Sequence, residues 1–396
     1  MFLTPPPWDA IILGGGASGL MCALTAAGRE RRVLVLEGGK KCGEKIRISG
    51  GGRCNFTNLN AAPENYLSSN PRFCISALKR YTPWDFIGLL EKHGVDWHEK
   101  AQGQLFCDDS AQQIVELLLD ECRAAGARIE RQRPVTRVQR SENGFLVQAG
   151  GETYAARALV VATGGKSIPK MGATGLAFTI AKQFGLNVIE PRAGLVPFTF
   201  HPADLEPLKP LAGISVEAEA RCASAHYADA LLFTHRGVSG PVILQLSSHW
   251  TPGEAIEINL LPGVDLAAQL IAAKRDAPKQ TLGGFLTQHL PKRVARHLAA
   301  PFGVDARLAD QPDKRLRELA QSIQAWRIVP SGTEGYRTAE VTVGGVDVDA
   351  IDSRSMMCRE IDGLYFIGEA LDVTGELGGY NFQWAWASGH AAGMDL

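Results

Sequence analysis

The sequence lacks the patterns that mark common structural metal sites and redox disulfides. Its eight cysteines include no C-x-x-C pair, and its nine histidines show neither H-E-x-x-H nor zinc-finger spacing. We therefore expect no metal site, mostly free thiols and no disulfide-reductase chemistry.

Net charge is nearly absent as well. The 41 Lys and Arg residues face 42 Asp and Glu residues, which leaves a formal charge of −1. This balance argues against a chain devoted as a whole to nucleic acid, although it leaves a local basic patch open. Residues 10–28 carry no charge, but five glycines interrupt them, so a strand, a turn and a helix explain them better than a membrane span. The first nine residues, MFLTPPPWD, have no basic n-region, so we expect no signal peptide and a cytoplasmic location.

The first strongly patterned segment predicts a strand–turn–helix unit. The apolar run 10–13 predicts a buried parallel strand, and residues 20–27 predict a helix of small residues. Residues 31–37, RRVLVLE, predict a second strand. A glycine-rich turn between the first strand and the helix is typical of a dinucleotide-binding fold.

The glycines of this turn and the acid after the second strand fit a dinucleotide. Gly14, Gly16 and Gly19 match G-x-G-x-x-G. The first allows a tight turn, the second a close approach to pyrophosphate, and the third close packing of helix on strand. The helix start offers N–H groups to the phosphates. Glu37, 21 residues after Gly16, is placed to accept hydrogen bonds from a ribose diol, which disfavours a 2′-phosphate.

A second glycine-rich stretch follows directly. Residues 42–58, CGEKIRISGGGRCNFTN, read neither as a helix nor as a strand interior, and they contain no Walker A motif. Apolar residues interleaved through the stretch argue against a linker. We predict a loop whose three glycines let the backbone approach the cofactor, while Lys45 and Arg53 supply positive charge. The alternative is that these two cations merely cap a surface loop.

Four blocks of the sequence carry a resemblance to a known family. They read GGGASG, CGEKIRISGGGRCNFTN, VVATGGKSIPKMGATG and GLYFIGEALDVTGELGGYNFQWAWASGHAAG. Together they resemble the BaiN/YhiN-like flavoproteins, a group that includes aminoacetone oxidase. The resemblance implies FAD, a Rossmann-type FAD domain split by an insertion, and a two-electron redox role. Activities in that group range from enone reduction in bile-acid intermediates to oxidation of a small aminoketone, so the resemblance leaves the substrate open.

The patterns and the resemblance together predict where the cofactor binds. In similar proteins an acid at the position of Glu369 bonds the ribitol chain, and a helix start after Gly378 and Gly379 faces flavin N1 and O2. Candidates for a catalytic role are Tyr380, Cys54 and Asn55. The predicted cofactor-binding residues are Gly14, Gly16, Ala17, Ser18, Gly19, Glu37, Gly38, Lys45, Ser49, Gly50, Gly51, Gly52, Arg53, Cys54, Asn55, Val135, Ala162, Thr163, Gly164, Gly165, Gly368, Glu369, Gly378, Gly379, Tyr380, Asn381 and Phe382.

Some of these residues have a structural interpretation beside the functional one. A buried free cysteine such as Cys54 is usually inert, and Tyr380 fits the capping of a turn as well as a place against the ring. We expect Trp384 and Trp386 to pack in the core.

The chain departs from the family in two segments. Gln104 and Cys107 stand where members have an arginine and a proline, and residues 355–359 read SMMCR in place of a TMESK-like segment. If either segment shapes the substrate pocket, the natural substrate differs from those of characterised relatives.

The middle of the chain predicts an insertion into an α/β FAD-binding domain. We assign residues 1–190 and 335–396 to the FAD domain of the two-dinucleotide-fold class, and residues 191–334 to the insertion. Within it, 191–262 read as a β-rich, barrel-like part that includes short strands over ADALLFTHRGVSGPVILQLS, and 263–330 as a small helical part. A substrate pocket at the boundary would follow the general preference of ligand sites for domain interfaces.

These features predict an FAD-dependent oxidoreductase that transfers a hydride between the flavin and a small or medium organic molecule. NAD(P)H or oxygen is the expected redox partner, and a nicotinamide would visit transiently because no second G-x-G-x-x-G is present. We expect no membrane partner and favour a small molecule over nucleic acid. The oligomeric state stays open.

Two rival functions remain. One is a flavoprotein acting on RNA through residues 274–327, where eleven Lys or Arg residues face five Asp or Glu residues. A solvated helix face is the structural explanation of that charge. The other rival is a flavin-binding redox regulator without turnover.

Overall fold

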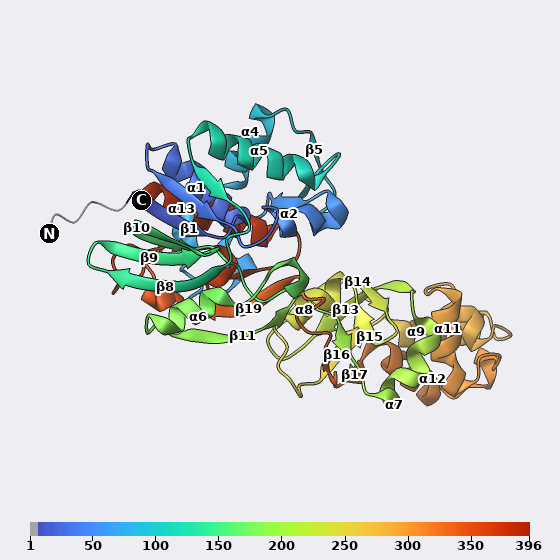
Figure 1. Cartoon of the computed structure of the whole chain (residues 1–396). Helices are drawn as coiled ribbons and strands as arrows, with labels where there is room; N and C mark the ends of the chain where they lie inside the picture. Colours follow the sequence, from blue (N-terminus) through green and yellow to red (C-terminus); the bar gives the residue numbers. More distant parts are fainter. Residues whose placement is uncertain (1–6) are drawn as a thin grey trace. The chain divides into compact units, whose positions relative to one another are not determined.

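The protein divides into two compact units. The computed structural model describes residues 7–396 (Figure 1). The first unit combines the chain up to Ala193 with Glu340–Leu396, and the second is Gly194–Ala339. Each unit has a hydrophobic core of its own.

A mixed sheet forms the centre of the first unit. In spatial order its strands are β7 (Arg128–Glu130), β2 (Val33–Leu36), β1 (Trp8–Leu13), β10 (Glu152–Val161), β9 (Gly144–Ala149) and β8 (Val135–Ser141). The first four run parallel, as does β20 (Leu364–Phe366), which pairs with the last residues of β10. The first half of β10 pairs antiparallel with β9. This is the Rossmann-type α/β fold that the sequence predicts.

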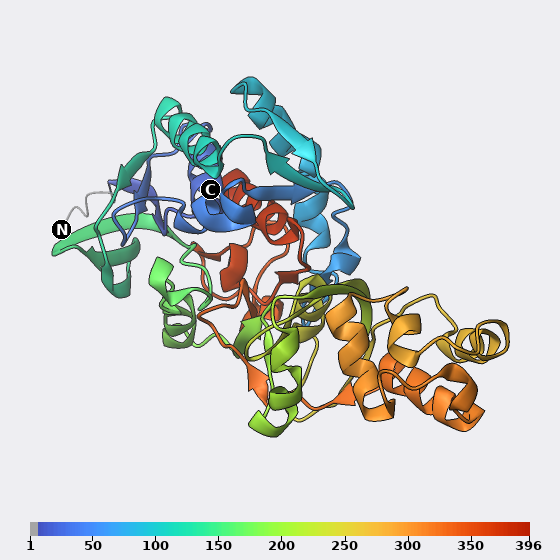
Figure 2. The same ribbon diagram turned by 90° about the vertical axis from the view of Figure 1, so that its right-hand side faces the viewer.

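The first and last helices of the chain pack against each other. Figure 2 shows α13 (Tyr380–Asp395), in red, among the blue N-terminal elements. Its partner α1 (Ala17–Ala27) is almost entirely buried. Both helices are rich in small residues, and Gly389 comes so close to α1 that a Cβ there would lie 2.4 Å from the Ser18 carbonyl oxygen. Trp384 and Trp386 are buried in this core, as predicted.

The remaining elements of this unit surround the sheet. The helices are α2 (Glu44–Ile48), α3 (Ile75–Arg80), α4 (Pro83–Lys92), α5 (Ala111–Ala124) and α6 (Leu176–Gln183). The short strands are β3 (Asn55–Asn58), β4 (Tyr66–Leu67), β5 (Trp97–Glu99), β6 (Gln104–Cys107), β11 (Val188–Gly194), β19 (Val341–Val346) and β21 (Thr374–Gly375). They pair as β3-β6-β5, β11-β19 and β4-β21.

The prediction that residues 42–58 contain no helix or strand was wrong. The stretch begins with the five-residue helix α2, turns through its three glycines, and ends as β3, which pairs with β6. Ile46 is fully buried, and Phe56 is buried in β3. Tertiary packing of these two side chains outweighs the weak local signal of the glycine-rich sequence.

The second unit contains one sheet of seven strands and a group of helices. The pairing order is β17 (Trp326–Ile328), β16 (Ile256–Asn259), β13 (Ser215–Arg221), β14 (His226–Phe233), β15 (Gly237–Ser239), β12 (Phe198–Thr199) and β18 (Gly332–Thr333). The helices are α7 (Pro202–Leu205), α8 (Pro241–Ser247), α9 (Leu266–Asp276), α10 (Leu282–Leu286), α11 (Lys292–Ala299) and α12 (Asp313–Gln324).

The block ADALLFTHRGVSGPVILQLS, predicted as short strands, contains strands in its first part, but its last seven residues, PVILQLS, form the helix α8. Gly240 and Pro241 stand at its start, and Pro at the first helical position fits because its missing N–H is not needed there. Val242, Ile243 and Leu246 are buried on one face. A short apolar run of this kind does not distinguish a strand from a buried helix.

No helix within residues 7–396 combines the length and the apolar character required to cross a bilayer. The uncharged stretch 10–28 contains β1 and α1.

The tight contact between α1 and α13 gives a stability prediction. Gly389→Ala should lower the unfolding free energy by about 1–3 kcal/mol, because the new methyl group meets backbone rather than a movable side chain. Gly88→Ala in α4 is the matched control, since its Cβ would meet no atom within 4 Å and should be neutral or stabilising by about 0.5–1 kcal/mol. Thermal unfolding measures both, and an unchanged midpoint for Gly389→Ala would contradict the close packing.

Candidate functional site

The glycine turn after β1 lies against the end of β10. Gly14 has φ +104°, and a Cβ there would lie 2.6 Å from the Ala162 carbonyl oxygen. A Cβ on Gly19 would lie 2.0 Å from the Gly14 carbonyl oxygen. Gly16, in contrast, has no atom within 4 Å of its Cβ position. The turn is therefore closed towards the sheet and open at the start of α1, where Ala17 begins the helix and its N–H groups suit a phosphate.

Glu37 is held at the end of β2 by backbone contacts. Its carboxylate accepts hydrogen bonds from the Gly15 N–H at 2.8 Å and the Gly39 N–H at 2.6 Å. The backbone carbonyl of Glu37 accepts a hydrogen bond from the Arg133 N–H at 2.8 Å. Val135, the first residue of β8, follows Arg133 by two positions. The carboxylate oxygens retain lone pairs for a ribose diol.

The three glycines of the signature stretch all adopt left-handed backbone conformations. Gly50, Gly51 and Gly52 have φ of +55°, +67° and +89°. A Cβ on Gly50 would lie 2.8 Å from the Asn55 nitrogen, whereas the Cβ positions of Gly51 and Gly52 are open. The left-handed conformation favours glycine at all three, and at the last two the open space leaves room for a ligand.

Cys54 follows these glycines with φ +49° and is fully buried. Burial raises the pKa of its thiol far above the usual value. The neutral, enclosed thiol has the character of a packing residue.

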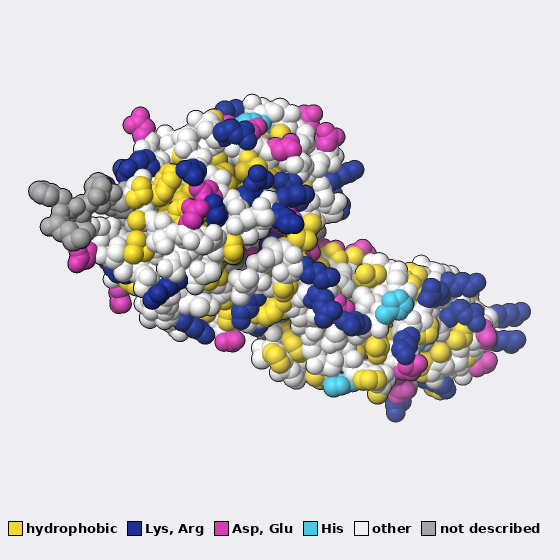
Figure 3. Space-filling model, in the orientation of Figure 1, with side chains coloured by type: hydrophobic (Ala, Val, Ile, Leu, Met, Phe, Trp, Pro, Cys, Tyr) yellow, Lys and Arg dark blue, Asp and Glu magenta, His cyan; other side chains and the backbone are white. Residues whose placement is uncertain are grey.

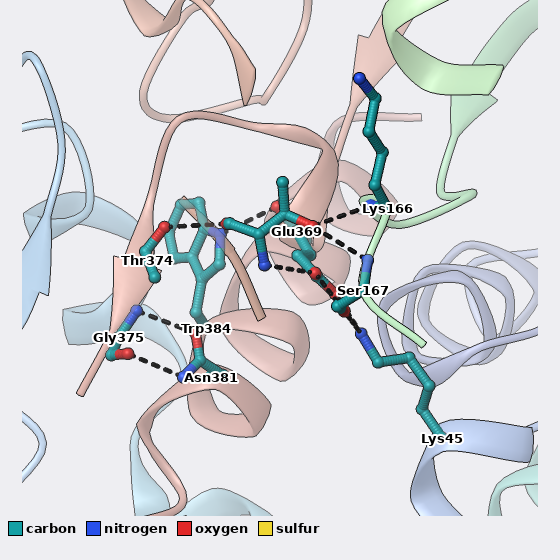
Figure 4. Close-up of polar contacts among 10 residues, drawn as sticks. Lys45, Lys166, Ser167, Glu369, Thr374, Gly375, Asn381 and Trp384 are labelled. Carbon is teal, nitrogen blue, oxygen red and sulfur yellow. Dashed lines mark hydrogen bonds and ion pairs between the residues drawn. The ribbon is translucent and has the colours of Figure 1, made fainter. Parts of the chain in front are cut away.

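The carboxylate of Glu369 joins three segments that are distant in sequence (Figure 4). One oxygen accepts from the Ser167 hydroxyl and the Thr342 N–H, both at 2.9 Å. The other accepts from the Lys45 ammonium at 2.5 Å, and Lys45 also donates to Ser167 at 2.6 Å. The Thr342 hydroxyl in turn accepts from the Lys166 N–H at 2.8 Å. This Glu369 cluster ties α2, the loop after β10, β19 and the turn after β20 together.

Gly165 and Gly368 make this cluster sterically feasible. A Cβ on Gly165 would lie 2.3 Å from the Thr342 hydroxyl, and one on Gly368 would lie 2.6 Å from the Ser18 hydroxyl. The Trp384 indole donates to the Gly368 carbonyl at 3.1 Å, so α13 also holds this turn. The predicted cofactor glycines from opposite ends of the chain thus converge with the start of α1.

The start of α13 packs on β3. A Cβ on Gly379 would lie 2.3 Å from the Thr57 carbonyl oxygen. The Asn58 amide donates to the Gly378 carbonyl at 2.8 Å, and the Thr57 hydroxyl donates to Gln383 at 2.6 Å. The helix start and the end of the signature stretch are therefore packed together.

Gln104, at which the sequence departs from the family pattern, packs against the start of α13. Its side chain is 3.1 Å from the Cβ position of Gly378, and its amide oxygen is 3.2 Å from the Asn55 carboxamide. In the orientation that satisfies both atoms of the Asn55 amide, its nitrogen donates to the Thr57 and Leu105 carbonyls, each at 3.2 Å. The other departures are structural in their contacts. Cys107 is the buried last residue of β6, and Met357 forms a backbone bridge with Tyr365 of β20.

Several predicted site residues have their side chains occupied within the protein. The Asn381 amide bonds to both backbone groups of Gly375, Phe382 stacks on Trp386, and the Ser49 hydroxyl donates to the Ile46 carbonyl. These residues shape the site through backbone or packing. Lys45 is bound to Glu369, so its charge is already partly neutralised. The Arg53 side chain is exposed.

Two observations test whether FAD suits these residues. The Thr163 hydroxyl oxygen is buried without a hydrogen-bond partner among residues 7–396. It lies next to Gly164, which has φ +69° and whose nearest contact from its Cβ position is a Glu369 oxygen at 3.9 Å. An orphaned buried hydroxyl is costly unless a ligand or water pairs with it. Together with the open Gly16, Gly51 and Gly52, it fits a bound dinucleotide.

Two members of the Glu369 cluster were not among the predicted site residues. Ser167 follows the TGGK motif by one position and could have been found by extending that block. No sequence motif around Thr342 marks it as a site residue. Its contact with Glu369 depends on the position of β19, the strand by which the chain returns to the first unit.

The comparison with family models agrees with this geometry. The model described as the HI0933-like protein Rossmann domain matches residues 8–395. The chain belongs to the HI0933-like family. The resemblance to BaiN/YhiN-type flavoproteins is confirmed, and the family consists of FAD-dependent oxidoreductases with FAD as the cofactor.

Three curated relatives cover nearly the whole chain. The ribosomal RNA dihydrouridine synthase of Escherichia coli strain K12 is 51% identical over 98% of both chains. The protein of the same name from Haemophilus influenzae is 48% identical, again over 98% of both. The 3-dehydro-bile acid delta(4,6)-reductase of Clostridium scindens is 29% identical over 96% of this chain and 97% of its own.

The open positions in the signature stretch give a cofactor prediction. Gly51→Val should yield largely FAD-free protein, because its side chain enters space that no protein atom fills. Gly94→Val is the matched control: Gly94 has φ +63° and an equally open Cβ position at the end of α4, so both variants carry a similar left-handed strain of roughly 1–2 kcal/mol. Absorbance of released flavin, identified by chromatography, measures retention. Equal FAD content in both variants would show that the stretch does not contact the cofactor.

Proposed function

We propose that this protein is an FAD-dependent enzyme that reduces uridine to dihydrouridine in ribosomal RNA. The observation that carries the proposal is the 51% and 48% identity, over 98% of each chain, to two proteins named for that activity. Alignment at this level spans every segment of the candidate site, including the signature stretch and the insertion.

This proposal reverses the preference that the sequence suggested. Patterns and charge balance favoured a small organic substrate and kept RNA as an alternative. The named relatives favour the RNA alternative, and a non-catalytic regulator loses support because both relatives are named as enzymes. The more distant bile-acid reductase supports a shared chemistry, because both names describe saturation of a carbon–carbon double bond in a conjugated system.

The reaction adds two electrons and two protons across one bond of the uracil ring. The C5=C6 bond of uracil is conjugated with the C4 carbonyl, so hydride addition at C6 leaves an enolate that takes a proton at C5. Bound FAD supplies the hydride in its reduced form. We propose that a nicotinamide visits transiently to provide the electron pair.

The residues around the start of α13 suit recognition of a uracil ring. The Asn55 carboxamide is used within the protein, because its nitrogen fits the Thr57 and Leu105 carbonyls, both at 3.2 Å, once the amide is turned over. The Gln104 carboxamide lies beside it, and an amide presents a donor and an acceptor side by side. That pattern is complementary to the N3–H and carbonyl edge of uracil. The arginine that the family resemblance implies at position 104 would offer donors only, whereas Gln104 offers a donor and an acceptor and carries no charge.

Among the three catalytic candidates, Tyr380 is the best suited to donate a proton to C5 of the uracil ring. Cys54 is enclosed, and the Asn55 amide is not an acid. The pKa of the Tyr380 phenol is raised mainly by burial and to a smaller extent by the nearby Glu376 carboxylate. The hydroxyl is therefore protonated through the neutral pH range, as a proton donor to C5 must be, and the raised pKa makes it a weaker acid than a free phenol.

A Tyr380→Phe substitution tests this role. We expect turnover of ribosomal RNA to fall by about 10²–10⁴-fold, the usual size of a general-acid contribution, while reduction of the bound FAD by a nicotinamide keeps its rate. Stopped-flow flavin reduction and reoxidation separate the two steps. If reoxidation by RNA is unchanged, Tyr380 serves only to pack against Tyr66.

The function itself is tested with purified protein and ribosomal RNA lacking the modification. We expect dihydrouridine to appear in the RNA when protein and a nicotinamide reductant are both present, as measured by mass spectrometry of the digested nucleosides. Gly51→Val, expected to lack FAD, is the negative control. Absence of dihydrouridine with fully flavinated protein, together with reoxidation by a small enone, would favour the small-molecule alternative. A ribosomal RNA substrate also supports the proposed cytoplasmic location.

A further inference from the structure

The second unit is divided into an acidic and a basic part. Residues 194–262 contain three Lys or Arg residues against seven Asp or Glu residues. Residues 274–327, which include α11 and α12, contain eleven against five. The unit is close to neutral as a whole, so the excess positive charge is confined to its helical part.

Packing leaves the cations of this part exposed. In α11, Val294, Ala295 and Ala299 are buried, while Lys292 and Arg296 are exposed. In α12 the leucines and Ile323 are buried, and Lys314, Arg315 and Arg317 are exposed. The apolar stripes face the core of the unit, so the cations occupy the opposite faces. Figure 3 shows Lys and Arg side chains gathered over this end of the second unit.

Few of these cations are neutralised by carboxylates. Within residues 7–396 the recorded ion pairs of this group are Lys274 with Asp313 at 2.8 Å and Arg327 with Glu257 at 4.0 Å. The nine cations that have no such pair are Arg275, Lys279, Lys292, Arg293, Arg296, Arg307, Lys314, Arg315 and Arg317. A face that is merely solvated usually mixes charges of both signs, and concentrated like charge costs stability unless a partner compensates it.

Aromatic side chains in this part are already engaged. Trp326 packs against Phe200 and Phe233, each with ring centroids 6.3 Å apart, and the Arg315 guanidinium lies 5.9 Å from the centre of the Phe302 ring. Stacking on unpaired bases needs free aromatic faces. The chemistry of this surface therefore suits phosphates, not bases.

We propose that these nine cations, the helical basic surface, bind the phosphate backbone of ribosomal RNA independently of its sequence. The inference rests on the proposed function, which supplies the RNA, and on charge complementarity. Phosphate contacts position a nucleic acid without reading its bases. The surface thus contributes affinity, while the residues around the FAD site select the uridine.

The test removes four cations whose side chains make no hydrogen bond, ion pair or ring contact within residues 7–396. Lys292, Arg296, Lys314 and Arg317 are changed together to Gln, and binding of a fluorescent ribosomal RNA fragment is followed by anisotropy over a range of salt. Each phosphate contact contributes about 0.7–0.9 to the slope of log K against log salt, so we expect the slope to fall by roughly 3 and affinity by at least about 10-fold. FAD content and the unfolding midpoint should stay unchanged.

A control variant carries the same change of charge on the first unit. Arg31, Arg72, Lys79 and Lys182 are exposed there and are changed together to Gln. We expect its RNA affinity and salt slope to match those of the wild type within about 2-fold. Equal slopes and affinities for wild type and the helical variant, or equal losses in both variants, would overturn the proposal.

Turnover distinguishes this inference from the proposed function. In the variant with four Gln substitutions in α11 and α12 (the helical variant), KM for ribosomal RNA should rise at least about 10-fold, and kcat at saturating RNA should stay unchanged. If the wild type forms dihydrouridine and the helical variant has an unchanged KM, the docking surface is wrong and the function stands. If RNA binding depends on these cations but no dihydrouridine forms, the surface stands and the function is wrong.

Discussion

The carboxylate of Glu369 holds the first unit together at the place where chemistry is expected. It forms an ion pair with Lys45 and accepts hydrogen bonds from the Ser167 hydroxyl and the Thr342 N–H. These three residues belong to segments separated by more than a hundred residues. Each of these donors satisfies part of a carboxylate that is largely withdrawn from water, and an unpaired polar group there would cost free energy. The ends of β10 and β20 and the start of the signature stretch are therefore fixed at the same edge of the sheet, the edge at which such folds bind dinucleotides.

This arrangement also explains how a long insertion is compatible with an intact FAD fold. The chain leaves the first unit through β11 and returns through β19, and these two strands pair with each other. Thr342 lies on the returning strand and belongs to the Glu369 cluster. Each unit buries its own apolar residues. In our proposal the first unit carries the hydride chemistry, and the helical part of the second unit carries the charge that a large RNA requires.

Two local errors show where sequence patterns mislead. Residues 44–48 form a helix and 55–58 a strand, although the stretch is dominated by glycine and polar residues. PVILQLS forms a helix although its apolar run suits a strand. In both cases the deciding factor is which side chains are buried by neighbouring elements, and short segments carry too little local preference to oppose it.

The sequence alone determined the features that depend on local conformation and short-range spacing. G-x-G-x-x-G, Glu37 and the alternation of strands and helices specified a Rossmann-type dinucleotide-binding fold, because turns and strand ends need particular residues at fixed separations. The choice of FAD came from the family resemblance. Tertiary structure decided the rest. It paired Lys45 with Glu369, brought Gln104 against Gly378, enclosed Cys54, and left nine cations of the second unit without carboxylate partners among residues 7–396. These outcomes depend on which distant segments meet, and contact between distant segments is set by packing of the whole core, which no local pattern encodes.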